Sequence, residues 1–176
     1  EDTLRLERLV TAGISDVAAV CIEDYDKGLL TDDLCQRIIQ AACKAGKPVL
    51  VDPARLNDYG KYRGATILTP NRQEFQMAAG CPGNGLEVIR RHVGRLIDEY
   101  DLQGLVVTLD RDGAVLALRG RDPMHIPTRP RAVYDNTGAG DAVLAMLAAA
   151  CVAGATWEQA TCLTNIAGGL EVEKFG

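Results

Sequence analysis

The sequence predicts one α/β domain with a central, mostly parallel sheet covered by helices. Short continuous apolar runs, such as 17–22 and 104–110, are typical of strands buried in a parallel sheet. Longer segments with apolar residues at helical spacing separate these runs; one of them, 31–46, has Thr31 at its cap position and Gly46 at its end. Strands that alternate with helices form right-handed βαβ units, so we expect a doubly wound layered fold over residues 1–176.

Each expected element follows from its own pattern. Apolar residues at helical spacing and capping signals mark the helices, and short apolar runs between polar turns mark the strands. The two strands before the last helices are expected to be antiparallel, because only a short polar turn joins them. In chain order we expect a helix ending at 3–13, strands at 17–22, 48–52 and 65–68 around the helix 31–46, helices at 71–80 and 84–101, strands at 104–110, 114–120 and 123–128, and helices at 139–153 and 156–171.

Polar or acidic loops follow four of the expected strands. In open α/β sheets, ligands bind outside the carboxyl ends of the strands. The loops after Ile22, Val51, Leu68 and Leu109 therefore form the candidate binding edge, and they read "EDYDKG", "DPAR", "TPNRQE" and "DRDG".

Charge and cysteine usage restrict the classes of partner and compartment. The formal net charge of -5 argues against nucleic acid or an anionic membrane as a partner. The longest apolar run, 142–153, is too short to cross a bilayer. The six cysteines form no C-x-x-C pair, which favours reduced core thiols in a cytosolic protein. His92 and His125 lack the spacing of metal ligands.

A glycine-rich stretch, "TGAGD", opens the apolar helix near the end of the chain. It matches neither the P-loop pattern nor a dinucleotide fingerprint. The first amides of a helix have no partner within it, so Gly138, Ala139, Gly140 and Asp141 can together present an anion site. Asp141 can also take a proton from a hydroxyl while these amides hold a phosphoryl group. The simpler alternative is that Asp141 only complements the helix N-terminus.

Several motifs in the same order resemble one enzyme family. "DNTGAGDAVLAML" resembles the D-T-x-G-A-G-D signature of the ribokinase/PfkB carbohydrate kinases, "TPNRQEF" their N-x-x-E motif, and "VVTLDRDGAVL" their T-x-x-x-x-G nucleotide segment. "EDYDKGLLT", "VDPAR…YRGATILTPN" and "NIAGGLEVEKFG" are most similar to the heptose-7-phosphate kinase branch, which starts ADP-heptose synthesis for lipopolysaccharide. The resemblance implies a three-layer Rossmann-like ribokinase fold and a phosphotransferase that uses ATP and Mg²⁺.

The resemblance also implies roles on the acceptor side of the site. Asp141 would be the general base that deprotonates the sugar hydroxyl, and Gly138, Ala139 and Gly140 would form the anion hole for the transferred phosphate. Lys27 would face a phosphate of ATP or of a phosphorylated sugar. The alternative for Lys27 is an ordinary solvated lysine.

On the nucleotide side, the resemblance assigns five further residues. Asn71 and Glu74 would hold Mg²⁺ and the ATP phosphates, largely through water, while Thr108 and Gly113 would lie along the ribose and phosphates and Asn165 would border the adenine. Each has a structural alternative: a capping box for Asn71 and Glu74, a strand end for Thr108, a turn glycine for Gly113 and a satisfied core amide for Asn165.

A monovalent cation, K⁺ in some members, is the third ligand that the resemblance implies. Asp135 and Thr137 stand at the positions concerned. Asn136 replaces the usual residue between them, which leaves turn chemistry as the alternative for Asp135.

Relative to the family, the chain begins inside the helix before the first strand and ends at "EKFG". We therefore expect it to be the C-terminal portion of a PfkB-type kinase, lacking the N-terminal part and lid, inactive or nearly so by itself and prone to form homo-oligomers. Its partners would be a nucleotide and a sugar phosphate in the cytoplasm. The alternatives are another sugar or nucleoside kinase of the family, such as a fructokinase or ribokinase, and a non-catalytic nucleotide-binding domain.

Overall fold

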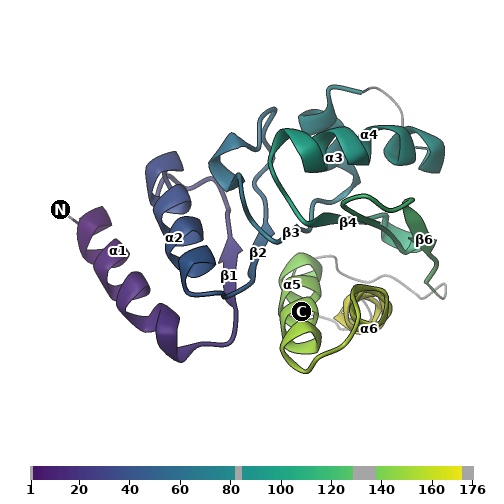
Figure 1. Cartoon of the computed structure of the whole chain (residues 1–176). Coiled ribbons are helices and arrows are strands. Elements are labelled where there is room, and N and C mark those ends of the chain that lie inside the picture. Colours follow the sequence, from purple (N-terminus) through teal and green to yellow (C-terminus); the bar gives the residue numbers. More distant parts are fainter. Residues whose placement is uncertain (1, 82–84, 129–137, 172–176) are drawn as a thin grey trace.

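One mixed six-stranded sheet organises the protein (Figure 1). The computed structural model describes residues 2–81, 85–128 and 138–171. The strands lie side by side in chain order, parallel from β1 to β4 and antiparallel from β4 to β6. Their bounds are β1 Val20–Glu23, β2 Val49–Asp52, β3 Ile67–Leu68, β4 Gly104–Thr108, β5 Ala114–Leu118 and β6 Met124–Ile126.

The helices divide between the two faces of this sheet (Figure 1). Because consecutive parallel strands are neighbours, right-handed crossovers put the connecting helices α2, α3 and α4 on one face. After the antiparallel strands the chain returns along the other face with α5 and α6, while α1 packs on α2. Their bounds are α1 Asp2–Gly13, α2 Asp32–Lys44, α3 Arg72–Ala79, α4 Leu86–Glu99, α5 Ala139–Val152 and α6 Trp157–Glu171, with short 3-10 turns η1 Ile14–Asp16, η2 Gly60–Tyr62 and η3 Asp110–Asp112.

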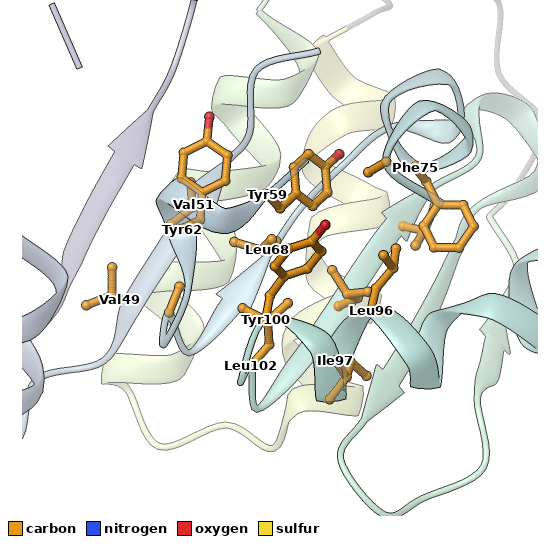
Figure 2. Packing of buried hydrophobic residues seen from close by; sticks show 14 of the residues in the cluster. Val49, Val51, Tyr59, Tyr62, Leu68, Phe75, Leu96, Ile97, Tyr100 and Leu102 are labelled. Atoms are coloured by element: carbon orange, nitrogen blue, oxygen red, sulfur yellow. The ribbon is translucent and has the colours of Figure 1, made fainter. Parts of the chain in front are cut away.

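Each face of the sheet has its own hydrophobic core, because side chains alternate along a strand. In β2, Val49 and Val51 join the cluster under α2, α3 and α4, whereas Leu50 joins the one under α5 and α6. Figure 2 shows the first cluster, where Tyr59 packs between Tyr62 and Tyr100 with ring centroids 5.8 and 6.0 Å away. The two cores hold the helices against the sheet. They therefore also fix the positions of the loops that connect strands and helices at the carboxyl edge of the sheet.

The expected α/β fold is confirmed, although each strand differs from its expected bounds by one to three residues. The first strand begins at Val20 rather than at residue 17, because the three residues after η1 lie outside the sheet. β3 is shorter than the expected 65–68. Thr66, just before it, still bonds to the neighbouring strand: its amide donates to the carbonyl of Val49 at 2.8 Å, and its hydroxyl accepts the amide of Val49 at 2.9 Å. The antiparallel arrangement of the last two strands is as expected.

The cysteines are free, as expected, but only two of them lie in the core. Cys35 and Cys81 are buried, whereas Cys21, Cys43 and Cys162 are exposed. The expectation of core thiols is therefore wrong for those three. None of the described helices is long and apolar enough to span a bilayer.

Candidate active site

The loops at the carboxyl ends of β1, β2, β3 and β4 lie at one edge of the sheet, together with the first turn of α5. One link across this edge joins residues 116 positions apart: the hydroxyl of Tyr25 donates to Oδ1 of Asp141 at 3.0 Å. The same hydroxyl lies 3.1 Å from Oε2 of Glu23, at the end of β1. Asp141 therefore faces the loop after the first strand, at the edge where the sequence predicts a ligand.

The start of α5 has the backbone that an anion site needs. Gly138 has φ +80°, a left-handed conformation that favours glycine, and its carbonyl accepts the amide of Ala142 at 3.0 Å. The amides before Ala142 have no partner within the helix. A Cβ on Gly140 would lie 2.8 Å from Oδ2 of Asp52, so the absence of a side chain lets the helix start approach that carboxylate. The backbone conformation at position 138 and the close approach to Asp52 at position 140 thus each account for a glycine.

Asp52, at the end of β2, is a largely buried acid with acidic neighbours. Burial, followed by the negative charge of Glu74, raises the pKa of Asp52 to about 7. The hydroxyl of Thr69 donates to its Oδ1 at 3.3 Å and opposes this rise, while the charges of Asp141 and Glu23 add to it. Sequence reasoning noted the loop "DPAR" but gave Asp52 no role; its position directly after a buried strand was the available signal.

Asn71 and Glu74 form a complete capping box at the start of α3. Oδ1 of Asn71 accepts the amide of Glu74 at 3.0 Å, and Oε2 of Glu74 accepts the amide of Asn71 at 2.8 Å. Burial raises the pKa of Glu74, against the bond from Asn71 and the charge of Arg55. The capping box that the sequence offered as the structural alternative is therefore present. It also fixes the side chains of Asn71 and Glu74 at the carboxyl edge of the sheet. Thr108 lies beside them, since it forms a parallel bridge with Asn71.

Gly113 and Asn165 meet over the end of β6. A Cβ on Gly113 would lie 2.2 Å from the carbonyl oxygen of Ile126, so no other residue fits there. Nδ2 of Asn165 donates to that same carbonyl at 2.9 Å. Packing against Ile126 alone accounts for both residue types, and their expected roles at the ribose and adenine stay predictions.

Arg72 is a charged residue at this edge that the sequence did not single out. Its guanidinium donates to the carbonyl of Leu109 at 3.1 Å and to Oδ2 of Asp112 at 2.7 Å, so it ties α3 to the loop after β4. Asp110 lies 3.9 Å from Nε of Arg72 with its side chain 80% exposed. Arg72 precedes the capping glutamate of α3, but no local signal connects it with a loop almost forty residues later.

The remaining expected residues have fewer structural constraints. Lys27 is exposed in the loop after β1, and its role toward a phosphate stays a prediction. Asp135 and Thr137, the expected ligands of a monovalent cation, lie outside the described residues.

A second buried acid near this edge has the opposite environment. Nζ of Lys61 and the hydroxyl of Tyr62 each lie 2.7 Å from Oδ2 of Asp24, and the amide of Asp26 donates to Oδ1 at 3.0 Å. Burial would raise the pKa of Asp24, but the hydrogen bonds from Lys61, Tyr62 and Asp26 outweigh it and lower the pKa below its usual value. The cluster fixes the loop that carries Tyr25.

The residues at the edge fit a cation that is held through water. In the described parts of the chain, no three His, Cys, Asp or Glu side chains gather closely enough to bind a metal ion directly. The acids Asp52 and Glu74 nevertheless have raised pKa values that a nearby cation would lower. Oxygen donors with room for water are what Mg²⁺ prefers.

The family model of the "pfkB family carbohydrate kinase" matches residues 9–176, which include every element of the sheet and of its carboxyl edge. The chain belongs to the pfkB family of carbohydrate kinases. The expected membership is thus confirmed, and so is the ribokinase-like α/β fold.

Among curated relatives of this pfkB-family chain, the "Bifunctional protein HldE" of Escherichia fergusonii is 41% identical over 175 residues. The match covers 99% of the present chain and 36% of that relative. The HldE of Citrobacter koseri has the same identity and coverage. The chain therefore spans about a third of the length of these relatives.

A solved structure with the same fold is that of Arabidopsis thaliana ribokinase complexed with ribose and ATP. It superposes with a TM-score of 0.83 at 26% sequence identity, and the match covers 94% of this chain and 53% of that one. The sheet and helices of the pfkB chain thus correspond to about half of a complete ribokinase.

Proposed function

We propose that the protein takes part in ATP-dependent phosphorylation of a sugar hydroxyl, with Asp141 as the general base. The observation that carries the proposal is the position of Asp141 in the first turn of α5, beside Gly140 and facing the loop after β1. A carboxylate within reach of an incoming hydroxyl can accept its proton, and amides at a helix start can hold the phosphoryl group that moves to it. Phosphoryl transfer demands chiefly positioning and charge stabilisation.

The chain's own residues would divide this work as follows. Asp141 accepts the proton of the acceptor hydroxyl, and the amides of Gly138, Ala139 and Gly140 hold the equatorial phosphate oxygens as charge develops on them. The apolar remainder of α5 packs into the second core, so the helix start stays aimed at the edge of the sheet. This rigidity is what an anion hole needs, because its donors must not reorganise during the reaction.

ATP would supply the phosphoryl group, and Mg²⁺ would neutralise its phosphates. Asn71 and Glu74, fixed by their capping box, are proposed to hold Mg²⁺ through water, and Thr108 and Gly113 to border the nucleotide. Asn165 would lie at the adenine. Asp135 and Thr137 are proposed to bind a monovalent cation such as K⁺.

The proposed acceptor is D-glycero-D-manno-heptose 7-phosphate, phosphorylated at its 1-hydroxyl. Two observations support it: the motifs that are most similar to the heptose branch, and the 41% identity with HldE relatives. Lys27 is available to face the phosphate of such a sugar. An ATP-dependent enzyme of this kind would act in the cytoplasm, and free thiols fit a reducing compartment.

A substrate panel on the full-length protein tests this proposal. Heptose 7-phosphate, fructose, ribose and adenosine are each offered with ATP and Mg²⁺, and transfer of phosphate is measured. We expect heptose 7-phosphate to have the highest kcat/KM. A preference for another member of the panel would reject the proposed substrate, and no transfer to any of them would reject the kinase function.

A further inference from the structure

The contact between Tyr25 and Asp141 has no place in the phosphoryl transfer as described so far. The Tyr25 hydroxyl lies 3.0 Å from Oδ1 of Asp141 and 3.1 Å from Oε2 of Glu23. A phenol has one proton, so it can donate to only one of these carboxylates at a time. The two geometries therefore describe one donor with two alternative acceptors.

The surroundings keep this donor in its protonated form. Hydrogen bonding to Asp141, and next to Glu23, raises the pKa of Tyr25 to about 12, so the phenol keeps its proton in the physiological range. The charged and titratable groups that face Asp141 from the described strands and loops are Glu23, Tyr25 and Asp52. Of these three groups, Tyr25 is the one that the structure shows donating a hydrogen bond to Asp141.

Tyr25 is exposed, whereas the residue before it is held by several bonds. Tyr25 is 61% exposed, so little packing opposes a swing of its side chain about the Cα–Cβ bond. The preceding residue, Asp24, is buried and bound to Lys61 and Tyr62, which fixes the start of the loop. A side chain that can swing on such a held backbone is suited to exchange between two nearby acceptors.

We propose that Tyr25 is a positioning residue that holds Asp141 in the unloaded site and passes its hydrogen bond to Glu23 when the acceptor hydroxyl arrives. This inference rests on the proposed function. In the unloaded site the phenol occupies the place beside Oδ1 where the acceptor hydroxyl has to donate its proton. When the phenol swings to Glu23, that lone pair of Asp141 becomes free to accept the proton of the acceptor hydroxyl.

The test combines Tyr25→Phe and Glu23→Gln in the full-length protein. In Tyr25→Phe, Asp141 permanently lacks the donor that holds it, so kcat should fall about twofold, while the KM for the acceptor should not rise because no phenol competes for Oδ1. In Glu23→Gln, the second acceptor is weaker, so the phenol stays on Asp141 and kcat/KM should fall about threefold or more. The double variant should lose this second effect, because no phenol is left to be released. Charge removed at position 23 is the same in both backgrounds and cancels in the comparison.

The carboxyl-carbon NMR resonance of Asp141, assigned through Asp141→Asn, gives a readout that needs no turnover. Tyr25→Phe removes the hydrogen bond to Oδ1 and should therefore shift this resonance, whereas Tyr59→Phe, a matched change in the core, should not. An unchanged Asp141 resonance in Tyr25→Phe, or additive effects of the two substitutions, would overturn the role of Tyr25 while turnover itself persists. Absence of turnover in the unmodified protein, with the change in resonance present, would instead reject the proposed function and the exchange with it.

Discussion

Asp24 and Asp52 lie at the ends of neighbouring strands, and their environments are opposite. Asp24 has an ammonium, a phenol and an amide as donors, and these lower its pKa despite burial. Asp52 has one hydroxyl donor and three acids around it, and its pKa rises to about 7. The charge of Asp24 is balanced by donors within the chain, and this carboxylate stabilises the loop. The charge of Asp52 is not balanced within the chain, which is typical of a site where a cation or substrate supplies the missing partner.

The largest expected loss of stability comes from removing the cation of the Asp24 cluster. In Lys61→Met, the carboxylate of Asp24 stays buried, with its side chain only 3% exposed, but loses its cation. Removal of one partner of a buried ion pair costs about 3 kcal/mol in the free energy of unfolding. Urea denaturation of the full-length protein measures this loss, with Lys44→Met, an exposed lysine on α2, as the control. Equal stabilities of the two variants would show that the Asp24 cluster contributes little.

Asp52→Asn should have the opposite effect, and only at high pH. Because the folded-state pKa of about 7 lies above the unfolded value, Asp52 contributes stability that is complete below the unfolded pKa and lost as pH rises through 7. Three pKa units correspond to at most about 4 kcal/mol, and partial exposure to water reduces this to about 2 kcal/mol.

The variant should therefore gain stability over the unmodified protein at pH 8.5 and not at pH 4.5. Asparagine keeps an acceptor for Thr69, so the comparison isolates the charge. Urea denaturation at the two pH values measures it. A stability difference that does not change with pH would contradict the raised pKa of Asp52.

Two tyrosines of the aromatic cluster show the same contrast between a polar group with partners and one without, and the expected effects are smaller. The Tyr62 hydroxyl donates to Asp24 at 2.7 Å and accepts the amide of Ala54 at 3.0 Å. Among the described side chains, the Tyr59 hydroxyl is buried without a hydrogen-bond partner. Tyr62→Phe should cost about 1.5 kcal/mol, whereas Tyr59→Phe should be neutral or slightly stabilising. Thermal denaturation of the two variants side by side checks the difference, and an equal loss in both would contradict it.

The sequence predicts the fold well because its signals are local. Apolar runs mark each buried strand, and Thr31 and Asn71 mark helix starts that the structure places within one residue. The glycines before Asp141 likewise indicate an anion site from their own conformational freedom. The edge of the sheet that carries the site follows from the parallel order of the strands alone.

The contacts that give the site its electrostatics are not local. Tyr25 meets Asp141 across 116 positions, and Lys61 meets Asp24 across the whole of α2 and β2. Neither pairing has a sequence pattern, because each depends on how the tertiary fold brings two separate loops together at the carboxyl edge of the sheet. The raised pKa of Asp52 depends in the same way on burial and on acids from other loops.

Replacement of Asp141 by asparagine in the full-length protein tests most directly whether the carboxyl edge of the sheet is a catalytic site. The substitution removes the base and keeps the shape of the side chain, so turnover with ATP and the best substrate of the panel should fall by roughly a factor of 10³ or more while ATP binding is retained. Asp122→Asn, in the exposed turn between β5 and β6, is the matched control and should leave both unchanged. Unchanged turnover in Asp141→Asn would contradict the role of Asp141 as the base.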